Sequence, residues 1–389
     1  MTVPLVRQIK RARPDARVTI MARIDPIAEV FRRLPEVDEA LVTAGGLRWK
    51  WADFKAVRSR RPDYFLIPFP SNRWQYGLLA LASGARHRVM HGYPVGYWRS
   101  MHFIPATRVP AERRIHDVVQ NLNLLRPLGI EPDPTEAPVF YVNDADRARA
   151  DELLGPALAR GDRRFVAIHA GSEANTLARA KRWPAPNYAR LIEAIVRELG
   201  LPVVLLEGPS EEGVGAQITS HLDPAVAASG DVVTRQLRGP LGDAAAVLER
   251  AALYAGSDSG LAHLAAAVGT RAVTLFAPAD PDRVSPVGNR EFVVKAPQSC
   301  NPCFTYPLDA TFPTVRCHEP YCIDSIKLES VMEAVRRALG PHSLFPVRRG
   351  EGGGEGQGSR DVERRPMAVG SRPSPQPSPR ITGEREQAR

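Results

Sequence analysis

One stretch of the sequence constrains the fold more than any other: Gly256-Ser257-Asp258-Ser259-Gly260-Leu261-Ala262-His263-Leu264-Ala265-Ala266-Ala267-Val268-Gly269. The apolar run 251–255 predicts a buried strand, the Asp-Ser-Gly turn begins an alanine-rich helix that ends at Gly269, and a second strand follows at 271–276. Free backbone N–H groups and the positive end of the helix dipole meet at such a turn. The turn therefore offers hydrogen-bond donors to a diphosphate or a sugar hydroxyl, while Asp258 either accepts from a ligand or caps the helix.

Helices and strands alternate along the rest of the chain. Further strands are predicted at 17–21, 64–68, 164–168 and 202–206. Helices are predicted from Pro4 to a stop at Pro14 and at 26–34, 49–60, 116–128, 144–158, 186–199, 244–250 and 324–339. This alternation favours parallel sheets covered by helices.

Size and charge limit the class of protein and its partners. A chain of 389 residues, 43% of them hydrophobic, can bury two cores. Its formal charge of +9 suits an anionic partner such as a sugar nucleotide, a phosphorylated glycolipid or the inner leaflet of a membrane. We expect no nucleic acid partner, since no recognised binding motif is present. No apolar run approaches the roughly 20 residues that span a bilayer, and the first residues have no apolar signal core, so we expect a cytoplasmic protein that can touch the inner membrane from inside.

The motif Asp-Ser-Gly-x-x-His-x-Ala-Ala-Ala-x-Gly resembles the signature of glycosyltransferase family 9, the bacterial heptosyltransferases of the lipopolysaccharide core. Other segments match in the family's order, among them His169-Ala170-Gly171, Lys181-Arg182-Trp183-Pro184, the loop 207–212 and Phe276-Ala277-Pro278. The resemblance implies the GT-B fold, in which two Rossmann-like domains with parallel sheets face each other across a cleft. We expect an acceptor-side domain at 1–150 and a nucleotide-sugar-binding domain at 160–340. The Gly- and Pro-rich composition of 341–389 predicts a disordered tail.

The resemblance implies an inverting, metal-independent transfer of heptose from an ADP-activated donor to a lipopolysaccharide core acceptor, with another nucleotide sugar or another lipid-linked sugar acceptor left open. The residues it assigns to the donor are Asp258, Ser259, Gly260, His263, Lys181, Thr176 and Glu211.

Each assigned residue has an implied role. Asp258 would hold hydroxyls of the donor sugar, and Lys181 with the backbone N–H groups of Ser259 and Gly260 would stabilise the departing diphosphate. His263 would lie near the phosphates or pack behind the site. Thr176 could add a hydroxyl donor, and Glu211 could hold ribose or base hydroxyls. The alternative for Lys181 is a solvated loop lysine.

The sequence departs from the family at its start. Family members begin one strand earlier, and an Asp in the Gly-Asp loop after that strand is their proposed general base. Met1 falls where this loop should already have passed. Either the start is misassigned or truncated, or the chain lacks both the strand and the base, and the sheet then loses a central strand. The catalytic base is therefore unknown, and two alternatives stay open: a non-catalytic nucleotide-sugar-binding module and a GT-B sugar-nucleotide epimerase.

Two further features allow more than one interpretation. The cysteines Cys300, Cys303, Cys317 and Cys322 could form a tetrahedral zinc site, or they could be reduced thiols of a cytosolic loop. Comparable cysteines occur in family members whose chemistry needs no metal, so we expect neither metal nor cofactor. The basic and aromatic segment 93–114 suits a phosphorylated sugar-lipid or is a solvated loop.

Overall fold

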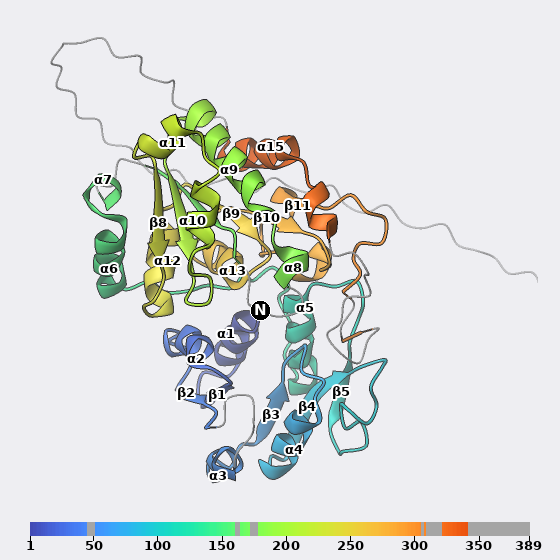
Figure 1. The fold of residues 1–389 in the computed structure, drawn as a ribbon. Coiled ribbons are helices and arrows are strands. Elements are labelled where there is room, and N and C mark those ends of the chain that lie inside the picture. Colours follow the sequence, from blue (N-terminus) through green and yellow to red (C-terminus); the bar gives the residue numbers. More distant parts are fainter. Residues whose placement is uncertain (45–50, 160–163, 172–177, 305–306, 309–320, 341–389) are drawn as a thin grey trace, which may run out of the picture. The chain divides into compact units, whose positions relative to one another are not determined.

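A six-stranded parallel sheet forms the C-terminal part of the molecule (Figure 1). Its strands are β6 (Val166–His169), β7 (Val203–Glu207), β8 (Val232–Gln236), β9 (Leu253–Ser257), β10 (Ala272–Phe276) and β11 (Val293–Lys295), in the spatial order β11-β10-β9-β6-β7-β8. Every residue of β6, β7, β9 and β10 is buried. Continuous apolar runs are expected in such strands, because helices cover both faces of a parallel sheet.

The structure is a computed structural model that describes residues 1–44, 51–159, 164–171, 178–304, 307–308 and 321–340. Three predictions fall outside these ranges: the role of Thr176, the fourth cysteine Cys317 and the tail 341–389. Within the described residues, no helix is long and apolar enough to cross a membrane.

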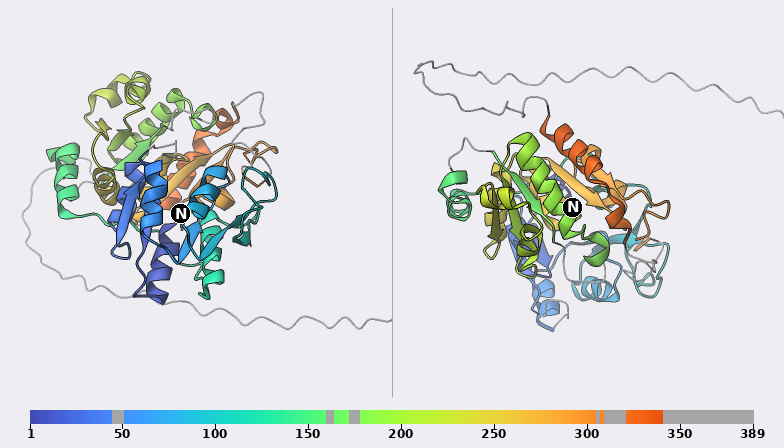
Figure 2. Two further views of the ribbon diagram at one scale, coloured as in Figure 1. Left: turned by 90° about the horizontal axis from the view of Figure 1, so that it is seen from below. Right: turned by 45° about the horizontal axis from the view of Figure 1, so that its top comes forward.

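Each face of the large sheet has its own core. Side chains alternate between the faces, so Val166 and Ile168 pack with α9 and α15, whereas Phe165 and Ala167 pack with α12 and α13. Helices α9 and α15 contact each other over the sheet (Figure 2). The helices of this part are α8 (Ala178–Lys181), α9 (Ala185–Ala194) with the π-helical turn η2 (Ile195–Leu199), α10 (Val214–Thr219), α11 (Pro224–Ala228), α12 (Leu241–Arg250), α13 (Gly260–Ala267), α14 (Pro281–Val284), η3 (Arg290–Phe292), η4 (Tyr321–Ser325) and α15 (Leu328–Leu339).

The N-terminal part contains two small parallel sheets. One pairs β1 (Thr19–Ala22) with β2 (Glu39–Val42), and the other has the order β3-β4-β5, formed by β3 (Tyr64–Ile67), β4 (His87–Gly92) and β5 (Thr107–Pro110). The connecting helices are α1 (Val3–Ala12), α2 (Asp25–Arg32), α3 (Trp51–Ser59) and α4 (Trp74–Ala82).

The two parts follow the same plan with one difference. Helices and strands of the N-terminal part, from α1 onward, follow one another in the same order as those of the C-terminal part after β6. The strand order β2-β1 and β3-β4-β5 then matches β8-β7 and β9-β10-β11, and the place of β6 between them has no counterpart among the described residues. Among the described residues, the N-terminal strands form two separate sheets where the C-terminal strands form one.

Two predicted helices are divided. The predicted helix 116–128 is α-helical only in α5 (Asp117–Leu122) and continues as the 3₁₀ segment η1 (Asn123–Leu128), which contains Pro127 and ends at Gly129 with φ 70°. Proline has no N–H for the α-helical hydrogen bond. The predicted helix 144–158 breaks at Gly155, with φ 75°, into α6 (Asp144–Leu154) and α7 (Pro156–Ala159).

Contacts do not divide the described chain into smaller units, since one compact unit starts at Met1 and includes all described residues. Its N- and C-terminal parts share specific contacts. The carboxylate of Glu29 accepts from the backbone N–H groups of Leu241 (2.8 Å) and Gly242 (3.0 Å), at the start of α12. The domain boundaries at 150 and 160 stay a prediction.

Candidate functional site

The strand order places a natural binding point between β6 and β9. From β6 the chain builds the sheet in one direction through β7 and β8, and it then returns to add β9, β10 and β11 on the other side. Ligands of open parallel sheets bind at the carboxyl ends of the strands where the order reverses. His169 ends β6 and lies opposite Gly256 of β9 in the register. Side chains that follow these two strands therefore meet at one edge of the sheet.

Lys181 and Asp258 form an ion pair at this edge. The Nζ atom of Lys181, the last residue of α8, lies 2.6 Å from Oδ2 of Asp258 and 3.5 Å from the Asp258 carbonyl oxygen. The side chains are 22% and 9% exposed. The structure thus brings together two residues that are 77 positions apart and whose implied roles were separate. The solvated-loop alternative for Lys181 is wrong.

Helix α13 begins at Gly260, two residues after Asp258. Of the two residues that could cap the helix, Ser259 rather than Asp258 is the N-cap, and the Ser259 hydroxyl makes no capping hydrogen bond. The first backbone N–H groups of an α-helix have no acceptor within the helix. Among the described residues, no atom lies within 4 Å of a Cβ atom added to Gly260, so none of them fills the space beside this turn.

A row of hydrogen bonds connects the ends of β7, β6 and β9. Nε2 of His169 lies 2.7 Å from Oε2 of Glu211, and Nδ1 of His169 lies 3.2 Å from the Ser259 hydroxyl, which is 3.2 Å from the hydroxyl of Tyr254. The carboxylate can only accept, so Nε2 carries the hydrogen, whereas either Nδ1 or the Ser259 hydroxyl can be the donor in the second bond. We call these four side chains the strand-end relay. Sequence reasoning missed two of them, since neither a strand-end His169 nor a strand-interior Tyr254 indicates a site by its type.

Glu211 is held in its charged form. Burial by itself raises the pKa of this carboxyl, but the hydrogen bond from His169 and a backbone hydrogen bond from Gly208 (2.8 Å) together hold the pKa below its ordinary value. A Cβ atom at Gly171 would overlap the Glu211 carboxylate, which explains a glycine in this loop. Glu211 was predicted to hold ribose or base hydroxyls, and that role stays a prediction.

His263 faces the same end of the sheet from α13. Burial lowers its pKa from 6.5 to about 4. The titratable groups around it are the Met1 α-amino group, His116 and Lys181, whose positive charge lowers the pKa further, and Asp258, which raises it. The imidazole is therefore neutral at pH 7, and His263 adds no positive charge to the site.

This burial predicts a pH-dependent stability. Because the folded pKa lies below the unfolded value, only the unfolded chain takes up the proton between pH 6.5 and about 4, and stability falls as the pH falls through this window. When the pH is lowered from 7 to 5, we expect the free energy of unfolding, measured with urea, to fall by about 2 kcal/mol less in His263→Asn than in the unmodified chain. Buried His91, with its pKa lowered to about 4, stays present in both proteins and serves as the internal reference. Parallel pH profiles would contradict a buried neutral His263.

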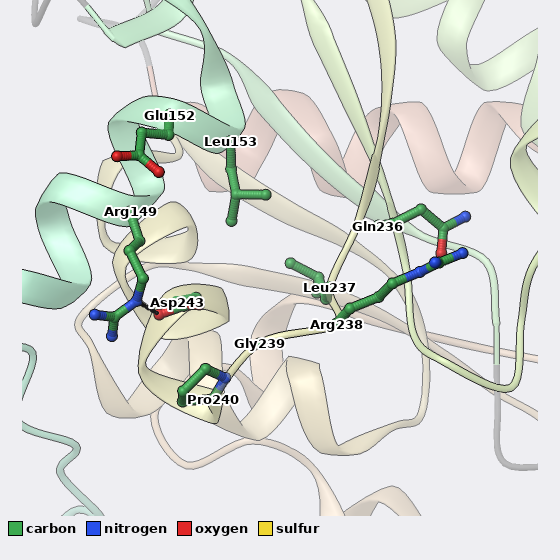
Figure 3. A pocket seen from close by; sticks show the side chains of 9 residues that line it. All are labelled: Arg149, Glu152, Leu153, Gln236, Leu237, Arg238, Gly239, Pro240 and Asp243. Carbon is green, nitrogen blue, oxygen red and sulfur yellow. Dashed lines mark hydrogen bonds and ion pairs between the residues drawn. The ribbon is translucent and has the colours of Figure 1, made fainter.

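A cavity of about 310 Å³ lies at the carboxyl end of β8 (Figure 3). It is lined by Arg149, Glu152, Leu153, Gln236, Leu237, Arg238, Gly239, Pro240 and Asp243. Nε of Arg149 lies 2.6 Å from Oδ1 of Asp243 across one wall. None of the residues predicted from the sequence lines this cavity. It lies three strand positions from β9, along the same edge of the sheet.

Three of the four cysteines, Cys300, Cys303 and Cys322, lie within the described residues. Within the described ranges, which leave out Cys317, no group of three or more His, Cys, Asp or Glu side chains could hold a metal ion. The zinc alternative is therefore untested.

A large parallel sheet joined to a second α/β part of the same plan is the arrangement of the GT-B fold. The chain belongs to glycosyltransferase family 9 (heptosyltransferase), whose family model matches residues 73–310, more than half of the chain.

Several relatives are similar over most of their length. The lipopolysaccharide heptosyltransferase 3 of Escherichia coli K12 is 25% identical over 292 residues, which cover 72% of this chain and 79% of the relative. The lipopolysaccharide heptosyltransferase 1 of Salmonella typhimurium LT2 is 30% identical over 326 residues, covering 72% and 94%. Among solved structures, the ADP-heptose lps heptosyltransferase II of E. coli has a TM-score of 0.63 at 20% identity and covers 87% of this chain and 94% of that chain. At this identity the structural likeness supports the fold alone.

Proposed function

We propose that the chain transfers heptose from an ADP-activated donor to a lipopolysaccharide core acceptor, with inversion at the anomeric carbon and without a metal ion. The observation that carries the proposal is the Lys181–Asp258 ion pair beside the start of α13, at the reversal point of the sheet. The ion pair places an ammonium group that can bind a diphosphate next to a carboxylate that can accept hydrogen bonds from sugar hydroxyls. The names of the relatives support heptose as the sugar.

The edge of the sheet fits an extended nucleotide sugar. The carboxyl ends of β9, β6, β7 and β8 follow one another at about 4.8 Å each, so the row spans about 14 Å. In our proposal the sugar lies at Asp258 and the diphosphate at Lys181 and the first N–H groups of α13. Glu211, after β7, then accepts from the ribose, and the base lies toward the cavity at the end of β8.

The proposed chemistry is one displacement. The acceptor hydroxyl oxygen forms a bond to the anomeric carbon as the bond from that carbon to the diphosphate oxygen breaks, and the electron pair leaves with ADP. Lys181 and the N–H groups of Ser259 and Gly260 stabilise the developing negative charge. The hydroxyl proton passes to a base. We assign that base to no residue.

A second candidate is a module that binds the nucleotide sugar without transferring it. It is favoured by the N-terminal part, where the position equivalent to β6 has no counterpart in the described chain. A sugar-nucleotide epimerase, the third alternative, would convert the donor without an acceptor.

Calorimetric titration of the full chain with ADP-heptose and with ADP tests the proposal, followed by turnover with a delipidated core oligosaccharide. We expect tighter binding of ADP-heptose than of ADP, and release of ADP only when the acceptor is present. Donor binding without release would identify the binding module, and conversion without acceptor the epimerase. A chain that melts cooperatively and binds neither ligand would contradict the proposed donor.

We also propose a cytoplasmic location with contact to the inner membrane from inside, because a lipid-anchored acceptor holds its sugar close to a bilayer surface.

A further inference from the structure

The strongest surface feature outside the site is an acid-free segment of the N-terminal part. From Tyr64 to Ala111 the chain has five arginines and no aspartate or glutamate. The whole chain has 43 acidic residues in 389, so 48 residues would contain about five on average. The segment includes β3, α4, β4 and β5, and it therefore forms one folded unit of positive charge.

The same segment exposes large aromatic side chains in the connection between β4 and β5, residues 93–106, which we call the aromatic loop. Tyr97, Trp98 and Phe103 are 52%, 76% and 53% exposed. They lie together: the ring centroids of Trp98 are 5.6 Å from Tyr97 and 5.5 Å from Phe103. Soluble surfaces seldom keep such a group of aromatic rings in water unless it binds something.

The aromatic loop is held in place from below. Met101 and Ile104 are buried against α4, and Met101 lies so close to Gly77 that a Cβ there would come within 2.7 Å of its sulfur. The backbone of Met101 has φ 50°, a conformation that costs energy for a residue with a side chain and is kept only where the surroundings enforce it. The exposure of Tyr97, Trp98 and Phe103 is therefore built into the fold.

Arginines surround the aromatic loop. Arg108 donates to the Met101 carbonyl (2.7 Å) and Arg88 to the Pro105 carbonyl (2.8 Å), so both guanidinium groups lie at its base. Arg73 precedes Trp74, which is 49% exposed and stands three residues before Gly77 on the same face of α4. Aromatic rings beside cationic side chains suit the interface of an anionic bilayer, where the rings enter the headgroup region and the arginines meet phosphates.

We infer that the aromatic loop, with Trp74, docks the enzyme on an anionic lipid bilayer. Charge complementarity selects this partner, since the whole segment has no acid that would repel a negative surface. The inference deepens the proposed function, because it names the surface that brings the enzyme to a lipid-anchored acceptor. It does not depend on which sugar is transferred.

Co-sedimentation of the full chain with vesicles tests the inference. We expect binding to vesicles of phosphatidylglycerol and phosphatidylethanolamine that weakens with salt, and little binding to phosphatidylcholine vesicles. The variant Trp98→Ser/Phe103→Ser should lower the partition coefficient at least about tenfold, because binding scales with the buried apolar area. The matched control is Trp51→Ser, which removes a tryptophan that is 82% exposed on α3, outside the segment, and should change binding less than about twofold.

A second measurement keeps the test independent of folding and of the proposed function. Brominated lipids should quench the fluorescence of the unmodified chain, and Trp74→Phe/Trp98→Phe should remove most of that quenching. Unchanged vesicle binding by the double serine variant would overturn the inference. Loss of turnover with a lipid-free acceptor in the double serine variant would also overturn it, because the loop would then contact the acceptor. A dimer seen by light scattering in the unmodified chain but not in the double serine variant would overturn it as well, because the loop would then be a dimer interface. Vesicle binding without donor binding would instead contradict the proposed function alone.

Discussion

Asp258→Ala lowers kcat/KM for the nucleotide sugar about 100-fold, or ~2.7 kcal/mol, while the midpoint of thermal unfolding moves by only a few degrees. The change removes a carboxylate that would accept from sugar hydroxyls. It also frees Lys181, whose Nζ lies 2.6 Å from that carboxylate, to leave the start of α13. Both losses act on the bound donor, whereas the cost to folding stays small because the Lys181 side chain left behind is 22% exposed and water can solvate it. Steady-state kinetics and calorimetry on the same preparation measure the two effects.

The matched control is Asp38→Ala. Asp38 also pairs with a lysine, Lys10, at 3.2 Å, but it lies in the N-terminal part beside β2. We expect this variant to keep full activity. Equal losses of activity and thermal stability in Asp258→Ala, or a similar loss of activity in Asp38→Ala, would refute the assignment of Asp258 to the donor site.

Asp117→Ala destabilises the fold by about 3–5 kcal/mol in urea unfolding. Asp117, at the start of α5, lies 3.1 Å from Arg283 of α14, and their side chains are only 7% and 8% exposed. The guanidinium group also lies over the ring of Phe69, 5.3 Å from its centroid. Removal of the carboxylate takes from the buried guanidinium the charge that lies 3.1 Å away. That loss exceeds what an exposed ion pair would contribute.

The double variant Asp117→Leu/Arg283→Leu separates charge from packing. Burial raises the pKa of Asp117 to about 6 although Arg283 lies beside it, so desolvation outweighs the attraction within the pair. An apolar replacement of both residues should therefore recover more than half of the stability that the single variant loses. A single variant that costs less than about 1 kcal/mol would show that Arg283 finds water or another partner when Asp117 is gone.

The sequence predicted the main strands of the C-terminal sheet because they are short apolar runs, each followed by a turn. It also predicted the edge at which Asp258 lies, since parallel strands share one carboxyl end. It did not reveal β8, whose Thr234, Arg235 and Gln236 make it polar, as suits an edge strand that is only half-buried. Nor could it reveal that Ser259 rather than Asp258 is the N-cap, because both residue types favour that position.

Contacts between distant segments were beyond any local pattern. The strand-end relay depends on the register of β6 against β7 and β9, which no single motif contains. The Glu29 carboxylate reaches the start of α12 from 212 residues away. A glutamate in an amphipathic helix predicts a solvated charge, and only the packed structure identifies it as a helix cap.

If the donor lies as we propose, the strand-end relay connects the end of the edge that holds the nucleoside with the end that holds the sugar. Glu211, His169, Ser259 and Tyr254 each depend on the neighbour's hydrogen for their own orientation, so a ligand group that engages Glu211 changes what the ring of His169 and then the hydroxyl of Ser259 can donate. The binding free energies of the nucleoside and of the sugar, each measured alone, would then not sum to the binding free energy of the whole nucleotide sugar. A ligand that has only the nucleoside or only the sugar would not determine which group donates each hydrogen bond of the strand-end relay.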